Sequence, residues 1–155
     1  MPKLAHLIAG ILAPLCIASF LLSTILFELF GSPAAVAQLK SLIVTPGLWI
    51  MVPVIAATGA SGGFLAGSRK GRAVDAKRKR MSFIAANGLL VLVPCAIVLD
   101  RWASAGVFDT AFYAVQAIEL IVGATNLMLM GLNVRDGLRL TGRMRVSPPT
   151  RSPTL

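Results

Sequence analysis

The chain has 155 residues, of which 56% are hydrophobic and 14% are charged, and its mean hydropathy is +0.80. A water-soluble domain usually carries about a quarter charged residues, so this composition excludes a soluble globular enzyme, a disordered chain and a disulfide-rich secreted module. The formal net charge of +9 would suit a nucleic-acid binder if the cations formed one surface. They lie instead in the gaps between long apolar blocks. We therefore expect a multi-pass membrane protein that does not bind nucleic acid.

Four apolar segments are long enough to cross a bilayer as helices, because the hydrocarbon core requires about 20 apolar residues. They lie at residues 4–27, 42–65, 81–99 and 111–132. The sequence therefore predicts an all-α fold, a bundle of four transmembrane helices over residues 1–133, joined by short connections.

The remainder of the chain, residues 134–155, is rich in arginine and proline. Residues 134–144 fit a short amphipathic helix in which Arg135, Arg139 and Arg143 share one face. Such a helix binds the anionic lipid headgroups of an inner leaflet, and a plain basic flank that fixes topology is the alternative. The proline-containing end is expected to be a disordered tail.

Positive charges in the connections predict the orientation of the bundle. Of the 15 Lys and Arg residues, seven lie at residues 68–80, five follow Asn133, and one is Lys3. Only two fall in the other two connections, residues 31–41 and 100–110, which are expected to be short, nearly neutral loops. The positive-inside rule then puts both termini and the middle connection in the cytoplasm. The predicted location is a bacterial inner membrane.

A cleaved signal peptide is the alternative reading of the first segment, with residues 35–37 as the cleavage site. The apolar run is longer than the roughly 7–15 residues of a signal-peptide core, which favours a retained helix. The other three helices would keep their orientation in either case.

A polar stripe runs down the fourth segment. At 100° per residue, Gln116, Glu119, Asn126 and Asn133 fit within an arc of about 100°. Uncompensated polar groups are costly in hydrocarbon, so the stripe must face protein or water. Asn87 in the third segment has a suitable depth to face the Asn126–Asn133 end of the stripe. These five residues form the candidate intramembrane site.

Glu119 is the member of the stripe that could carry chemistry. It lies near mid-membrane, where an ionised carboxylate is costly unless it is paired. No Lys or Arg is expected at a similar depth, so the sequence predicts a neutral, hydrogen-bonded acid. Two roles remain open: a proton-coupling or substrate-binding acid, and a carboxyl that joins neighbouring helices through hydrogen bonds.

Three glycines recur every four residues towards the end of the second segment: Gly59, Gly63 and Gly67. This small-xxx-small spacing lets helix backbones approach closely. It predicts a packing face, against either a helix of the same chain or a second copy.

Motifs for catalysis and cofactor binding are absent from the sequence. There is no P-loop, GxSxG or HExxH. Cys16 and Cys95 lie inside apolar segments and form no CxxC. A zinc site needs several ligands, and His6 is the only histidine, so a haem would need a ligand from a partner. We therefore predict no catalytic residue, no metal and no cofactor.

These observations favour a small non-catalytic accessory or scaffold protein that packs against itself or another membrane protein. The main alternative is a small proton-coupled transporter or channel that uses Glu119. A weaker alternative is the membrane anchor of a redox enzyme.

Overall fold

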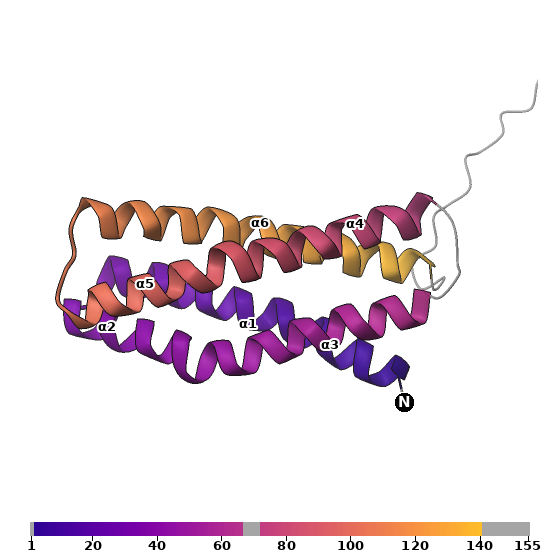
Figure 1. Cartoon of the computed structure of the whole chain (residues 1–155), viewed down its shortest axis with the longest axis horizontal. Helices are drawn as coiled ribbons and strands as arrows, with labels where there is room; N and C mark the ends of the chain where they lie inside the picture. The colour runs from indigo at the N-terminus through magenta and orange to yellow at the C-terminus, as the bar shows by residue number, and fades with distance from the viewer. Residues whose placement is uncertain (1, 67–71, 141–155) are drawn as a thin grey trace, which may run out of the picture.

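The computed structural model describes residues 2–66 and 72–140, and this part of the chain is helical apart from two short turns. Four helical spans are long and apolar enough to cross a membrane: Gly10–Phe30, Pro33–Ala57, Arg78–Ser104 and Thr110–Gly137. The predicted all-α fold with four such helices is therefore confirmed at the level of length and composition. Figure 1 shows the helices lying side by side as one elongated bundle.

The first helix, α1 (Pro2–Phe30), is joined to the next by a two-residue turn. Gly31 donates its N–H to the carbonyl oxygen of Phe27 at 2.8 Å. A Cβ at Gly31 would lie 2.5 Å from that oxygen, so only glycine fits here without a shift of the backbone. Ser32 then caps the following helix, because its Oγ accepts a hydrogen bond from Ala35 N at 3.3 Å.

The second span is a broken helix that begins earlier than hydropathy predicts. It consists of α2 (Pro33–Leu42), a wide turn η1 (Ile43–Leu48) and α3 (Trp49–Ala66). Thr45 has non-helical angles (φ −135°, ψ 109°), because the residue before a proline is disfavoured in the helical region. The prediction of a loop at residues 31–41 is therefore wrong, because most of these residues belong to α2.

The physical reason for this earlier start is a helix-start signal that an apolar-run criterion ignores. Ser32 followed by Pro33 is a favoured N-cap and first-turn pair. The residues after it are mostly alanine and leucine, which propagate a helix well.

The third span contains α4 (Arg72–Asn87), a wide turn η2 (Gly88–Leu92) and α5 (Val93–Ser104). Pro94 follows the wide turn, and a proline inside a helix removes a hydrogen bond and crowds the carbonyl four residues earlier. The fourth span, α6 (Thr110–Leu140), is a single helix of 31 residues.

The connection between α5 and α6 is also short. Gly106 adopts a left-handed conformation (φ 72°), and Val107 N donates to Trp102 O at 2.8 Å. Asp109 Oδ1 then accepts from Phe112 N at 2.9 Å at the start of α6. This connection and the Gly31–Ser32 turn lie at the same end of the bundle, which we name the short-turn end (Figure 1). The opposite end, where α4 begins and α6 finishes, is the basic end.

Two small apolar clusters form the core. Near the short-turn end the buried members are Val36, Leu99, Ala103 and Phe112. Farther along the bundle they are Ala13, Ile17, Met51, Ile84 and Met130.

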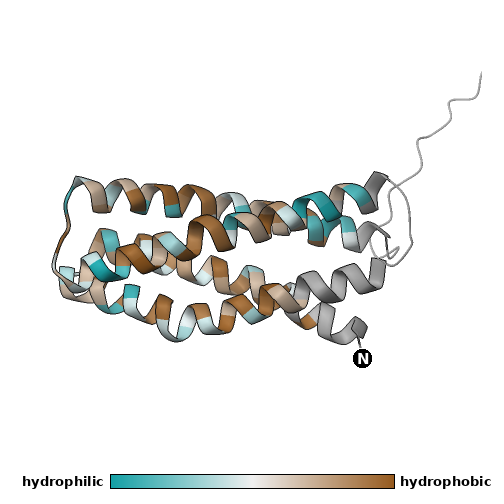
Figure 2. Cartoon of the chain, in the orientation of Figure 1, coloured by the Kyte–Doolittle hydropathy of each residue, from teal (hydrophilic) through white to brown (hydrophobic). Residues whose placement is uncertain are grey.

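Large apolar side chains cover the outside of the bundle. Phe30, Trp49 and Leu90 are 82%, 77% and 75% exposed. Figure 2 shows hydrophobic residues along the middle of the bundle and hydrophilic residues concentrated at the basic end of α4. An apolar exterior with a partly polar interior is the distribution that lipid solvation favours.

Candidate functional site

The polar stripe of α6 points into the bundle. Gln116, Asn126 and Asn133 are 4%, 0% and 8% exposed, and the Glu119 side chain is 14% exposed. The structure therefore places these four residues against neighbouring helices, at three successive levels along the bundle.

At the first level, Glu119 is paired with Lys40 of α2. Lys40 Nζ donates to Glu119 Oε2 at 2.9 Å, and Gln116 Nε2 donates to the same oxygen at 3.0 Å. The Lys40 side chain is only 1% exposed. The expectation that no cation lies at the depth of Glu119 is therefore wrong, and an ion pair replaces the expected neutral acid.

The early start of α2 explains this correction. Lys40 is the eighth residue of α2 and not a loop residue. At 1.5 Å per residue it lies about 10 Å from the start of that helix. Glu119 lies nine residues into α6, and both helices begin at the short-turn end, so the two side chains reach a common level.

Glu28 of α1 is a further acidic residue with a buried side-chain oxygen, and it was not among the predicted site residues. The buried oxygens Glu28 Oε1 and Gln116 Oε1 have no hydrogen-bond partner within the described part of the chain. We name the group formed by Lys40, Gln116 and Glu119 the Lys40 cluster.

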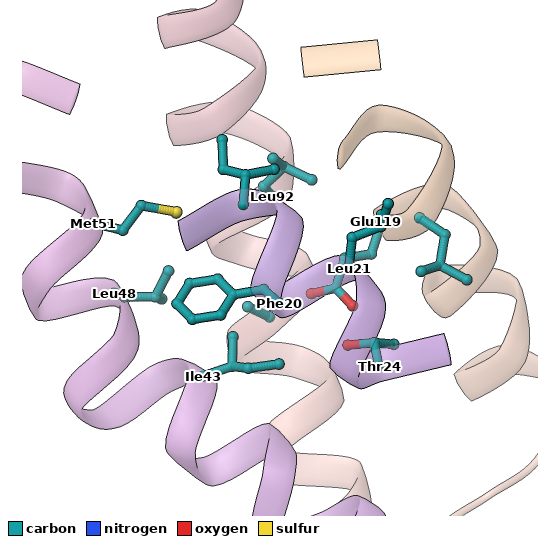
Figure 3. Close-up of a pocket in the computed structure, with 11 residues that line it drawn as sticks. Phe20, Leu21, Thr24, Ile43, Leu48, Met51, Leu92 and Glu119 are labelled. Carbon is teal, nitrogen blue, oxygen red and sulfur yellow. The ribbon is translucent and has the colours of Figure 1, made fainter. Parts of the chain in front are cut away.

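A cavity of about 50 Å³ adjoins the Lys40 cluster. Glu119 and the buried Thr24 supply polar atoms to its wall, and the remaining lining residues are apolar. Figure 3 shows the carboxylate of Glu119 and the hydroxyl of Thr24 on one side of the cavity, with Leu48 and Met51 on the other. The cavity lies between α1, η1, α3, η2, α5 and α6.

At the second level, Asn126 bridges α6 to α4. Asn87 Nδ2 donates to Asn126 Oδ1 at 3.3 Å, and Asn126 Nδ2 donates to the carbonyl oxygen of Ile84 at 3.2 Å. Both halves of the buried amide are thereby satisfied. The structure thus brings together Asn87 and Asn126, two of the predicted site residues.

At the third level, Arg80 of α4 holds two residues of α6. Its Nη1 donates to Asn133 Oδ1 at 3.2 Å, and its Nη2 donates to Asp136 Oδ2 at 2.8 Å. Arg135 Nε also donates to Asp136 Oδ1, at 3.3 Å. Neither Asp136 nor Arg80 was predicted, because basic residues such as Arg80 serve as topology signals and Asp136 follows the end of the apolar segment at residue 132.

The remaining predicted residues are described only in part. Arg135 is 48% exposed at the basic end. The backbones of Arg139, Gly59 and Gly63 are helical, but their surroundings lie outside the described side chains. Gly67 and Arg143 lie outside the described residues altogether.

Other reactive groups are dispersed. Cys16 and Cys95 are free thiols. No group of three or more His, Cys, Asp or Glu side chains suited to a metal occurs within residues whose side chains are described. Ser41 Oγ donates to Asp100 Oδ1 at 2.6 Å, which ties α2 to α5 beside the Lys40 cluster.

The four long apolar helices and the buried polar levels between them are those of a multi-pass membrane protein. The chain matches no protein-family model, no curated protein and no solved structure.

Proposed function

We propose that this protein is a non-catalytic accessory or scaffold subunit of a bacterial inner membrane, with both termini on the cytoplasmic side. The observation that carries the proposal is the use of the polar residues of α6. At each of the three levels they bind another helix of the same chain, through Lys40, Asn87 and Arg80. Polar groups that form hydrogen bonds between helices of one chain stabilise the bundle.

A bundle with one stable arrangement is suited to the assembly of a membrane-protein complex. Interhelical hydrogen bonds in membranes contribute about 0.6–2 kcal/mol each, so the three levels hold α6 against α2 and α4 in one arrangement. The bundle then offers a fixed apolar exterior to a second copy or to another membrane protein. The exposed Arg135 at the basic end is positioned for contact with anionic headgroups of the cytoplasmic leaflet.

The test is recovery of the protein from native membranes. A tagged full-length chain is extracted in mild detergent and its mass is measured by native mass spectrometry. We expect a defined assembly, either several copies or one copy with another membrane protein at fixed stoichiometry. Recovery as a lipid-bound monomer under several mild detergents would remove the scaffold proposal.

A second candidate is a small proton-coupled transporter or channel, favoured by the cavity that borders Glu119. Its test is proton flux into vesicles containing the protein. Glu119→Gln keeps the shape and hydrogen-bonding capacity of the side chain and removes its charge, so a transporter would lose flux while staying folded. Asp75→Asn, which alters an exposed residue of α4, is the matched control. A Glu119→Gln protein that is folded, correctly inserted and fully functional in the cell excludes this candidate.

A further inference from the structure

The basic end of the bundle holds one carboxylate between two guanidinium groups. Arg80 Nη2 donates to Asp136 Oδ2 at 2.8 Å, and Arg135 donates to Asp136 Oδ1 through Nε at 3.3 Å and Nη2 at 3.4 Å. These three residues together carry one positive charge in excess. Arg80 and Asp136 are partly buried, whereas Arg135 is 48% exposed. The excess charge is therefore most accessible at Arg135.

Asp136 orients the Arg135 guanidinium and leaves one of its edges free. A guanidinium has five N–H groups in a rigid planar fork. Two of them, on Nε and Nη2, bind Asp136, so the other three, on Nη1 and Nη2, are left for another acceptor. Paired N–H groups of this kind bind two oxygens of one phosphate.

An exposed apolar strip leads along α6 to Arg135. Met128, Gly131 and Arg135 are separated by three and four residues, so they lie on one face of the helix. Met128 and Gly131 are both exposed, and a Cβ at Gly131 would contact nothing beyond its own helix within 4 Å. At 1.5 Å per residue, Met128 lies about 10 Å from Arg135 along the helix axis.

The depth of Arg135 matches the surface of a bilayer. The third candidate span begins at Arg78, and the fourth ends at Gly137. Arg135 lies two residues before that end, where the headgroups meet the hydrocarbon core. Met128 lies deeper, at the level of the acyl chains. This face of α6 thus offers apolar contacts to an acyl chain and a guanidinium to the phosphate above it.

We propose that Arg135, oriented by Asp136, binds the headgroup phosphate of one anionic phospholipid whose acyl chain lies along Met128 and Gly131. An anionic lipid balances the excess positive charge, whereas a zwitterionic lipid does not. This inference deepens the headgroup contact of the proposed function and rests on membrane insertion. It does not rest on the scaffold role, because a monomer and an assembly can each carry the lipid, so the two proposals fail independently.

The first experiment titrates the full chain in detergent with phosphatidylglycerol and counts the bound lipids by native mass spectrometry. Wild type should bind one phosphatidylglycerol in preference to phosphatidylethanolamine. Arg135→Gln should weaken this binding about five-fold, the factor expected for one basic residue at a lipid surface. Lys79→Gln removes a charge from an exposed position of α4 and is the matched control, which should retain the lipid.

A second variant distinguishes an oriented site from a general attraction between charges. Asp136→Asn raises the net positive charge of the basic end, so a general attraction would strengthen lipid binding. An oriented site predicts weaker binding, because Asp136 is the positioning residue that holds the Arg135 fork. Asp136→Glu keeps the carboxylate and should restore at least part of the binding. Thermal unfolding of each variant checks that it is folded.

Equal binding of phosphatidylglycerol and phosphatidylethanolamine by wild type would overturn the proposal. So would full binding in Arg135→Gln, or stronger binding in Asp136→Asn. Displacement of the lipid by inorganic phosphate at the same concentration would show that the group binds a free anion instead. If Asp136→Asn does not fold, Arg135→Lys takes its place, since it keeps the charge and loses the fork. Wild-type binding in Arg135→Lys would then count against the site.

Discussion

Each end of the bundle holds a carboxylate of α6 with cationic side chains, but the two ends differ in the number of cations and in their exposure. At the short-turn end, Lys40 is 1% exposed and pairs with one carboxylate, that of Glu119, at 2.9 Å. At the basic end, Asp136 accepts from two guanidinium groups, Arg80 and Arg135, in a more exposed setting. A buried charge must find its counter-charge inside the protein, whereas exposed excess cations can use water and lipid phosphates.

The largest expected effect is the loss of the buried cation. Lys40→Met leaves the Glu119 carboxylate without its counter-charge, and breaking a buried pair in this way costs about 3–5 kcal/mol. We expect a strongly lowered unfolding midpoint, or loss of the monodisperse species in size-exclusion chromatography. Lys79→Met, at an exposed position of the basic end, is the control. The double variant Lys40→Met with Glu119→Gln should recover part of the loss, and no recovery would mean that charge is not the cause.

A smaller effect is expected midway between the two ends. Asn126→Leu deletes the bridge to Asn87 and to the Ile84 carbonyl. The cost should be about 0.6–1.7 kcal/mol, in the range of interhelical hydrogen bonds in membranes. Thermal unfolding in detergent measures it. A decrease in stability as large as that of Lys40→Met would show that the uncharged level stabilises the bundle as much as the Lys40–Glu119 ion pair does.

A still smaller effect is expected at the basic end. Arg80→Met removes the donors to Asn133 and Asp136, but Asp136 keeps Arg135 and access to solvent. Pairs of this exposure contribute little and are screened by salt. The unfolding midpoint should fall less than in Asn126→Leu, and the difference from wild type should shrink at high salt. A large, salt-independent decrease would contradict the contrast between the ends.

No change in stability is expected from the test of orientation. Ala73→Cys near the start of α4 and Ser104→Cys near the end of α5 mark the two ends. A membrane-impermeant thiol reagent applied to intact spheroplasts should label position 104 and spare position 73. The parent chain, with Cys16 and Cys95 in apolar helices, gives the background. The reverse pattern would show that the basic end faces away from the cytoplasm.

Sequence periodicity predicted which side of α6 is buried but not what meets it there. The spacing of Gln116, Glu119, Asn126 and Asn133 follows from the helical repeat, and equal depth was enough to suggest Asn87. Lys40 was not predicted as the partner of Glu119, because a hydropathy criterion treats a charged residue beside an apolar run as part of a loop. The cap at Ser32 is the local signal that would have extended the helix through it.

Glu28 was missed for a different reason. It lies near the end of α1, where a charged residue is usually solvated. The burial of its Oε1 depends on how the helices pack, and no local pattern encodes that arrangement. The two wide turns, η1 and η2, likewise depend on helix packing as well as on the prolines near them.

The two-residue turn at Gly31 and Ser32 has a consequence for biosynthesis. A connection this short obliges α1 and α2 to enter the bilayer together as a hairpin, and that hairpin already contains both Glu28 and Lys40. One acidic and one basic residue therefore enter the bilayer together, before the ribosome has synthesised α6. Glu28→Gln should then slow membrane integration of a chain truncated after α3, whereas Glu119 has no part in that early step.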